Sequence, residues 1–75
     1  MAKSSDLYPG AISTISSKRI VYNGINLYGQ LITIVNVFKF NGKDVAEVRF
    51  HDESIPLKYI FCRHISRPKS AANKK

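Results

Sequence analysis

Residues 31–40, LITIVNVFKF, are the longest run of strand-forming side chains in the chain. β-Branched and aromatic residues fit a pleated, half-buried surface, so this run predicts a β-strand. Side chains alternate between the two faces of a strand, which places one set together: Ile32, Ile34, Phe38 and Phe40. The opposite face is also apolar as far as Lys39. The pattern therefore predicts a strongly bent strand that is buried on both sides for part of its length.

Two Asn-Gly dipeptides, Asn23-Gly24 and Asn41-Gly42, predict tight hairpins. Asn and Gly accept the positive φ angles of a type I′ turn, and strand formers flank both pairs. The first hairpin joins residues 19–22 to 25–28, and Gly29 after it predicts a bulge or bend. The second turn, residues 41–44, leads into a return strand at 45–50. That strand alternates cleanly between an apolar and a polar set, which predicts one solvent-facing side: Ala46, Val48 and Phe50 against Glu47, Arg49 and His51.

The ends of the chain carry weaker patterns. Residues 1–17 are Ser-rich with a Pro9-Gly10 turn signal, which indicates a flexible start or one edge strand. After Pro56, residues 57–61 fit a single helical or 3₁₀ turn or an edge strand. We favour the turn, followed by a short last strand at 62–65. Residues 66–75 lack apolar periodicity and predict a basic, disordered tail.

Five short strands, two tight turns and one helical turn before the last strand make a mostly β domain over residues 18–65. This layout is similar to that of SH3-like barrels of the KOW and Tudor kind, over roughly residues 18–66. The similarity rests on strand count and turn placement without a family motif. It implies a small barrel and leaves function open, because such barrels host many binding roles. A packed part of about 50 residues also keeps a homodimer open as a source of stability.

Charge is unevenly distributed along the chain. The sequence contains twelve Lys and Arg residues and five Asp and Glu residues, which gives a formal net charge of +7. Residues 54–75 contain no acidic residue and six basic ones, so the C-terminal third carries most of the excess. The apolar fraction of 44% is ordinary for a folded protein. Neither a secretory signal nor a membrane-spanning run is present in the sequence, and a lone cysteine fits a reducing compartment, so we expect a cytoplasmic protein, nucleoid-associated if it binds DNA.

Catalytic and metal-binding motifs are weak. Cys62 and His64 would share a strand face, with His51 as a distant third group, but this is not a recognised zinc spacing and lacks a fourth ligand. A small core cysteine beside a surface histidine is the better interpretation. The adjacent Asp52 and Glu53 diverge, and neither a phosphate-binding glycine loop nor a nucleophile elbow occurs in the sequence. We therefore expect a protein that is not an enzyme and has no cofactor, metal or small-molecule substrate.

Basic residues interleaved with aromatic ones are the remaining chemical signal. Cations on one side of a sheet neutralise phosphates and release counterions, and tyrosines stack on bases or pack along sugars. We expect a nucleic-acid-binding module that contacts the phosphate backbone, with double-stranded DNA ahead of RNA, through a basic sheet face and the tail. There is no recognition helix to enter a major groove. The candidate residues are Lys18, Arg19, Tyr22, Tyr28, Lys39, Arg49, Lys58, Arg63, Arg67 and Lys69.

Three other interpretations compete with this one. The first is a protein-interaction adaptor or phage-type regulator that binds an acidic surface of a larger machine, with an exposed apolar patch on the long strand: Leu31, Val35 and Val37. The second is that positive charge serves solubility alone and the tyrosines are half-buried. The third, a membrane-surface role, lacks an amphipathic helix or lipidation motif in the sequence.

Overall fold

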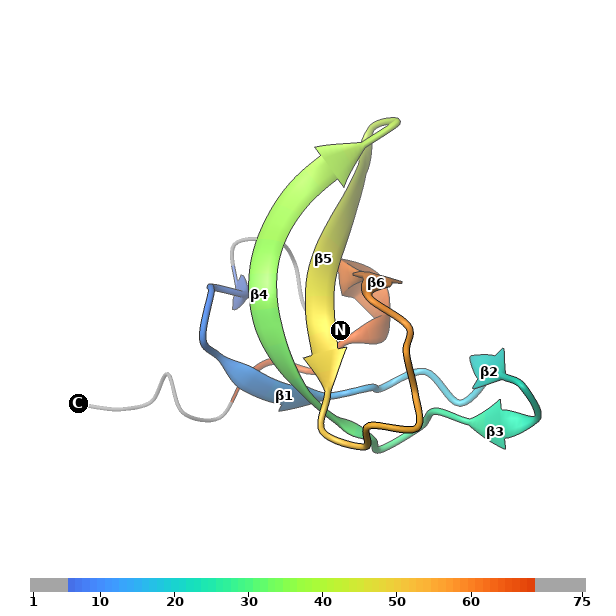
Figure 1. Ribbon diagram of the computed structural model, residues 1–75. Coiled ribbons are helices and arrows are strands. Elements are labelled where there is room, and N and C mark those ends of the chain that lie inside the picture. Colours follow the sequence, from blue (N-terminus) through green and yellow to red (C-terminus); the bar gives the residue numbers. More distant parts are fainter. Residues whose placement is uncertain (1–5, 69–75) are drawn as a thin grey trace.

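The computed structural model describes residues 6–68 and is mostly β, as the sequence predicts (Figure 1). In chain order the elements are β1 (Ile12–Thr14), β2 (Val21–Tyr22), β3 (Ile25–Asn26), β4 (Leu31–Phe40), β5 (Lys43–Phe50), β6 (Tyr59–Phe61) and the 3₁₀ turn η2 (Cys62–His64). β1, β4, β5 and β6 pair antiparallel in that order as one sheet. β2 and β3 form a separate hairpin, which projects from the end of the sheet opposite the β4–β5 turn (Figure 1).

Both Asn-Gly turns form as predicted. Asn23 and Gly24 have φ angles of 50° and 78°, and Asn41 and Gly42 have 52° and 75°. Positive φ at both central residues is what a type I′ turn requires, and it matches the twist of the flanking strands. The second turn is only two residues long, so Phe40 pairs with Lys43 and the return strand starts earlier than the predicted residue 45.

A β-bulge corrects the predicted faces of β4. Ile32 and Ile34 pair with buried partners in β5, but the register shifts between Ile34 and Asn36. One extra residue on one strand reverses the alternation beyond it. Val37 therefore packs against the core, whereas Phe38 and Phe40 lie on the opposite, outer face of the sheet. The prediction that these phenylalanines share a face with Ile32 and Ile34 was wrong.

The core lies on the face of the β4–β5 pair that carries Ile32, Ile34 and their partners Phe50 and Val48. It is built from apolar side chains of every part of the described chain: Leu7, Ala11, Ile15, Leu27, Ile32, Ile34, Ala46, Val48, Phe50, Ile55, Ile60, Cys62 and Ile65. β5 has the predicted single wet face, since its three core residues alternate with exposed or half-buried Glu47 and Arg49. The prediction that β4 is buried on both sides was wrong, because Leu31 and Val35 are exposed.

The order of strand and helical turn near the C-terminus differs from the favoured prediction. Tyr59–Phe61 is strand β6, and the 3₁₀ turn Cys62–His64 follows it. The physical reason is period-2 alternation: Ile60 points into the core while Tyr59 and Phe61 point outward. Pairing with β5 satisfies this backbone, and the Val48 N–H also donates to the Lys58 carbonyl at 2.7 Å. The predicted last strand, 62–65, is reduced to a single bridge at its final residue.

The N-terminal segment belongs to the sheet and the core. β1 lies at one edge of the sheet, and Leu7, Ala11 and Ile15 are buried. An isolated antiparallel bridge joins Ile15 to Ile65. Strand pairing does not close the sheets into a barrel. Of the predicted tail, residues 69–75 lie outside the described residues.

Candidate functional site

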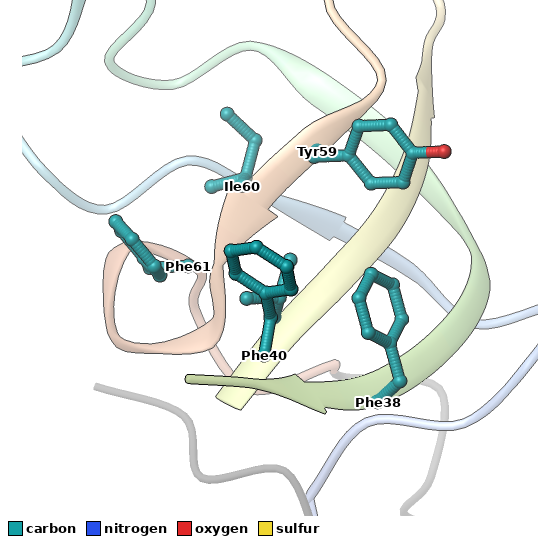
Figure 2. A pocket seen from close by; sticks show the side chains of 6 residues that line it. Phe38, Phe40, Tyr59, Ile60 and Phe61 are labelled. Atoms are coloured by element: carbon teal, nitrogen blue, oxygen red, sulfur yellow. The ribbon is translucent and has the colours of Figure 1, made fainter. Parts of the chain in front are cut away.

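Aromatic side chains from β4 and β6, with Val45 of β5 between them, surround a hollow on the outer face of the sheet (Figure 2). This aromatic hollow has a volume of about 480 Å³ and is lined by Phe38, Phe40, Val45, Tyr59, Ile60 and Phe61. Neighbouring β4, β5 and β6 bring these residues together although they lie up to 23 positions apart in sequence, from 38 to 61. It is the first candidate for a binding site, because clustered exposed apolar side chains mark interaction surfaces.

Strand register explains why the rings gather. Phe38 pairs with Val45, which in turn pairs with Phe61, so the three side chains form one row across the sheet. Tyr59 points to the same face, two residues before Phe61 on β6. Without the bulge in β4, Phe38 would face the core and the row would be broken. The bulge therefore creates the hollow.

The rings are held apart and leave surface open to solvent. Phe38 and Tyr59 meet edge to face, with centroids 6.0 Å apart and an interplanar angle of 84°. Phe40 is 62% exposed and Tyr59 56% exposed. Edge-to-face contact stabilises a ring pair. The arrangement thus offers flat apolar surfaces to a ligand.

Two cations flank the hollow at Phe61. The Lys43 ammonium lies 5.6 Å from the Phe61 ring centroid and the Arg63 guanidinium carbon 5.5 Å from it. His64 also contacts this ring, at 6.2 Å between centroids. Burial, and secondarily the charge of Arg63, lower the pKa of His64 below its usual 6.5, so the imidazole is neutral at pH 7. The hollow therefore combines aromatic walls with two positive charges at one side.

A second hollow lies between β5 and residues 53–58 and has a different charge pattern. Its volume is about 590 Å³. Two acids, Glu47 and Glu53, line it together with two bases, Arg49 and Lys58. The rest of its lining is apolar: Val35, Val48, Phe50, Ile55, Pro56 and Leu57. In this mixed hollow two acids stand among the predicted site residues Arg49 and Lys58, although neither cation forms an ion pair.

The first hairpin holds a third set of predicted residues. The Lys18 ammonium lies 5.4 Å from the Tyr28 ring centroid, and both side chains are exposed. Arg19 is exposed, whereas Tyr22 is half-buried and packs against the core. The hairpin lies at the other end of the molecule from the β4–β5 turn (Figure 1). These residues therefore form a group separate from the aromatic hollow.

The remaining predicted cations take part in ion pairs or lie beyond the described chain. The Lys39 ammonium is 4.0 Å from a carboxylate oxygen of Asp44, and the Arg67 Nε is 3.6 Å from Asp6. Lys69 lies outside the described residues. Of the predicted site residues that the structure describes, only Arg63 lies at the rim of the aromatic hollow.

Sequence reasoning missed four residues that build this hollow, Phe38, Phe40, Lys43 and Phe61, and noted Tyr59 among the interleaved aromatics without selecting it as a site residue. The alternation at residues 59–61 could have identified the outward pair on β6. The bulge that turns Phe38 outward has no comparable sequence signal, because residues 34–36 carry neither glycine nor proline.

Cys62 is buried, and this burial raises the pKa of its thiol, with a smaller contribution from the Asp44 charge. A buried, protonated thiol is a poor nucleophile. Within residues 6–68 no group of three or more His, Cys, Asp or Glu side chains is placed to hold a metal ion. In the same part of the chain no helix is long and apolar enough to cross a bilayer.

Comparisons with known proteins give no match: no family model fits the sequence, and no curated protein or solved structure is significantly similar to the chain.

Proposed function

We propose that the protein is a non-enzymatic module that binds nucleic acid through contacts with the phosphate backbone. The observation that carries this proposal is that the cationic side chains are exposed and mostly without a carboxylate partner. All eight lysine and arginine side chains within residues 6–68 are exposed, and only Lys39 and Arg67 among them pair with a carboxylate within 4.0 Å. Exposed, unneutralised cations attract a polyanion and release counterions when it binds.

The carboxylates do little to oppose such a ligand. Asp6 and Asp44 pair with cations. Asp52 accepts hydrogen bonds from the Ser54 amide and hydroxyl at 3.0 and 2.7 Å, which lowers its pKa and fixes its loop. Glu47 and Glu53 belong to the mixed hollow. A polyanion is therefore drawn toward the aromatic hollow, where neither Lys43 nor Arg63 pairs with a carboxylate.

The finer fold that we propose is an SH3-like barrel of the KOW and Tudor kind. Its support is the set of contacts between the two ends of the described chain. The Ser16 amide donates to the His64 carbonyl at 2.8 Å, and the Ser66 amide donates to the Thr14 carbonyl at 2.9 Å. Ser13 Oγ also donates to the Ser66 carbonyl. These bonds bring β1 beside the segment after η2, and this proximity of the two ends supports the proposed barrel. The fold by itself assigns no function.

The proposal is tested by fluorescence anisotropy with labelled duplex DNA, single-stranded DNA and structured RNA. We expect binding to at least one of them at about 50 mM salt, and a steep loss of affinity by about 200 mM. Absence of binding to all three at the lower salt, or an affinity that ignores salt, contradicts a phosphate-binding role. The result also bears on location, since a nucleic-acid ligand fits the cytoplasmic placement expected from the sequence.

A protein-interaction adaptor is the second candidate, and one observation favours it. Ile12, Leu31 and Val35 are exposed on adjacent strands β1 and β4, with exposed fractions of 49%, 48% and 42%. Ile12 pairs with Thr33 and Leu31 pairs with Thr14, so Ile12 and Leu31 share one face at the β1 edge. Val37, which the sequence also suggested for this patch, packs against the core. Failure to bind any polynucleotide, together with a stoichiometric protein complex that Leu31→Glu abolishes, would assign the adaptor role in place of the first proposal.

A further inference from the structure

We infer that the aromatic hollow binds unpaired bases, which makes single-stranded nucleic acid the preferred ligand of the protein. This inference rests on the proposed function and narrows its ligand class. It departs from the preference for duplex DNA that the sequence suggested, because sequence analysis did not place Phe38 and Phe40 on the outer face.

Ring exposure is the first argument. Four aromatic side chains, Phe38, Phe40, Tyr59 and Phe61, are exposed around one hollow. Every base has a flat π-face, so exposed rings act as stacking platforms without regard to sequence. In a duplex the base faces are already stacked and cannot reach such rings. The rings therefore contribute binding energy only with unpaired bases.

Charge at the rim is the second argument, and it selects among occupants of an aromatic hollow. Lys43 and Arg63 lie within 5.6 Å of the Phe61 ring centroid. A cationic ligand, which aromatic walls otherwise favour, is repelled by these two charges. An anionic ligand with flat apolar groups is favoured by both parts of the site. A single strand has these properties, with bases on the rings and phosphates at Lys43 and Arg63.

Strand geometry gives the size of the platform. Phe38, Val45 and Phe61 lie on three adjacent strands, and strands in a sheet are about 4.8 Å apart, so the row spans about 10 Å. Phe40 and Tyr59 extend it along the strands in the two directions (Figure 2). A surface of this extent contacts more than one nucleotide, so removing one ring weakens binding without abolishing it.

The test compares a labelled oligothymidylate with a duplex of random sequence, at about 50 mM salt. Thymidylate does not self-pair, so all of its bases are available for stacking. The wild-type protein should bind the single strand more tightly than the duplex. Phe40→Ala with Tyr59→Ala should weaken single-strand binding at least about 30-fold, because two stacking rings are lost and each stacked base contributes about 1–3 kcal/mol. Duplex binding should change less than about threefold.

Tyr28→Ala is the matched control. It removes an exposed tyrosine that also carries a lysine over its ring, but at the first hairpin. We expect it to change single-strand binding less than about twofold. Both altered side chains of the test variant are more than half exposed, so the fold is retained; thermal unfolding of each variant verifies this.

The outcomes separate this inference from the proposed function. Equal binding of single strand and duplex, with no effect of the double variant, overturns the inference while nucleic-acid binding stands. Absence of binding to either oligonucleotide overturns both. Loss of single-strand binding in Tyr28→Ala but not in the double variant assigns the hairpin as the site and also overturns the inference. Unchanged single-strand affinity in the double variant also overturns the inference, even if the single strand binds more tightly than the duplex, because the hollow then does not hold the bases.

Discussion

The aromatic hollow and the mixed hollow lie next to each other along β5 and are of similar size, but they differ in their walls and charges. The first has four exposed rings and two cations at its rim. The second has no aromatic side chain except buried Phe50, and two acids offset its two bases. Volume alone thus says little about the ligand; the side chains that line each hollow decide whether a polyanion is attracted.

The largest expected effect is on the free energy of unfolding, and it tests the bulge in β4. The bulge turns Phe38 and Phe40 outward and so makes the two hollows different. Ile34→Ala should cost about 2–5 kcal/mol of unfolding free energy, because Ile34 is fully buried. Phe40→Ala, a larger truncation on the same strand, should cost less than about 1 kcal/mol because the ring is exposed. Urea unfolding measures both. Equal costs would mean that Phe40 faces the core and that the bulge is absent.

Charge reversal at each hollow gives the next largest effect. Lys43→Glu with Arg63→Glu should weaken single-strand binding roughly a hundredfold, since like charges placed against phosphates cost several kcal/mol. Arg49→Glu with Lys58→Glu changes the net charge by the same amount and serves as the matched control. We expect it to weaken binding less than about tenfold in the same anisotropy titration. An equal loss in both variants would show that only net charge matters.

Salt dependence sharpens the comparison further. Each phosphate neutralised on a single strand contributes about 0.7 to the slope of log K against log salt concentration. Lys43→Ala should therefore reduce the slope by about 0.7, and Lys58→Ala should leave it nearly unchanged. Anisotropy titrations at four salt concentrations give both slopes. A reduced slope in the Lys58 variant alone would mean that the phosphates contact the mixed hollow and not the aromatic hollow.

The smallest effect is the pH dependence of stability at His64, beside Phe61. Burial lowers the pKa of His64 in the folded protein, so the unfolded chain binds its proton more readily. The contribution of neutral His64 to the free energy of unfolding is complete above about pH 6.5, the pKa of histidine in the unfolded chain. It declines as the pH falls below that value. The melting temperature should drop between pH 7.5 and 5, and less so in His64→Gln. The hydrogen-bonded Asp52 has a pKa below 3.8 and titrates outside this window. An identical drop in melting temperature in the wild type and in His64→Gln would contradict the claim that His64 causes this pH dependence.

Local patterns predicted much of the fold. Asn-Gly pairs require positive φ whatever surrounds them, and the alternation in β5 follows from having one wet face, so both features could be derived from neighbouring residues. The bulge in β4 could not be derived, since it depends on how Ile34 and Val37 fit against β5. The choice between strand and turn at residues 57–61 likewise depends on whether β5 is available as a partner.

The candidate site was harder to predict for the same reason. Charged residues were selected from the sequence one by one, and the structure distributes them over the hairpin, the mixed hollow and the rim of the aromatic hollow. The sequence places Phe38 and Phe40 among ordinary strand formers and Tyr59 and Phe61 in a favoured turn, because outward orientation shows only in strand register. A binding surface made across three strands leaves no contiguous motif.

The most direct test of this account is a titration of isotope-labelled protein with oligothymidylate, followed by the aromatic ring resonances in NMR spectra. Stacked bases shift the ring protons they cover, so the account predicts large upfield shifts at Phe38, Phe40, Tyr59 and Phe61, and small ones at Tyr28. Shifts confined to Tyr28, or to backbone amides around Arg49 and Lys58, would contradict the claim that unpaired bases occupy the aromatic hollow.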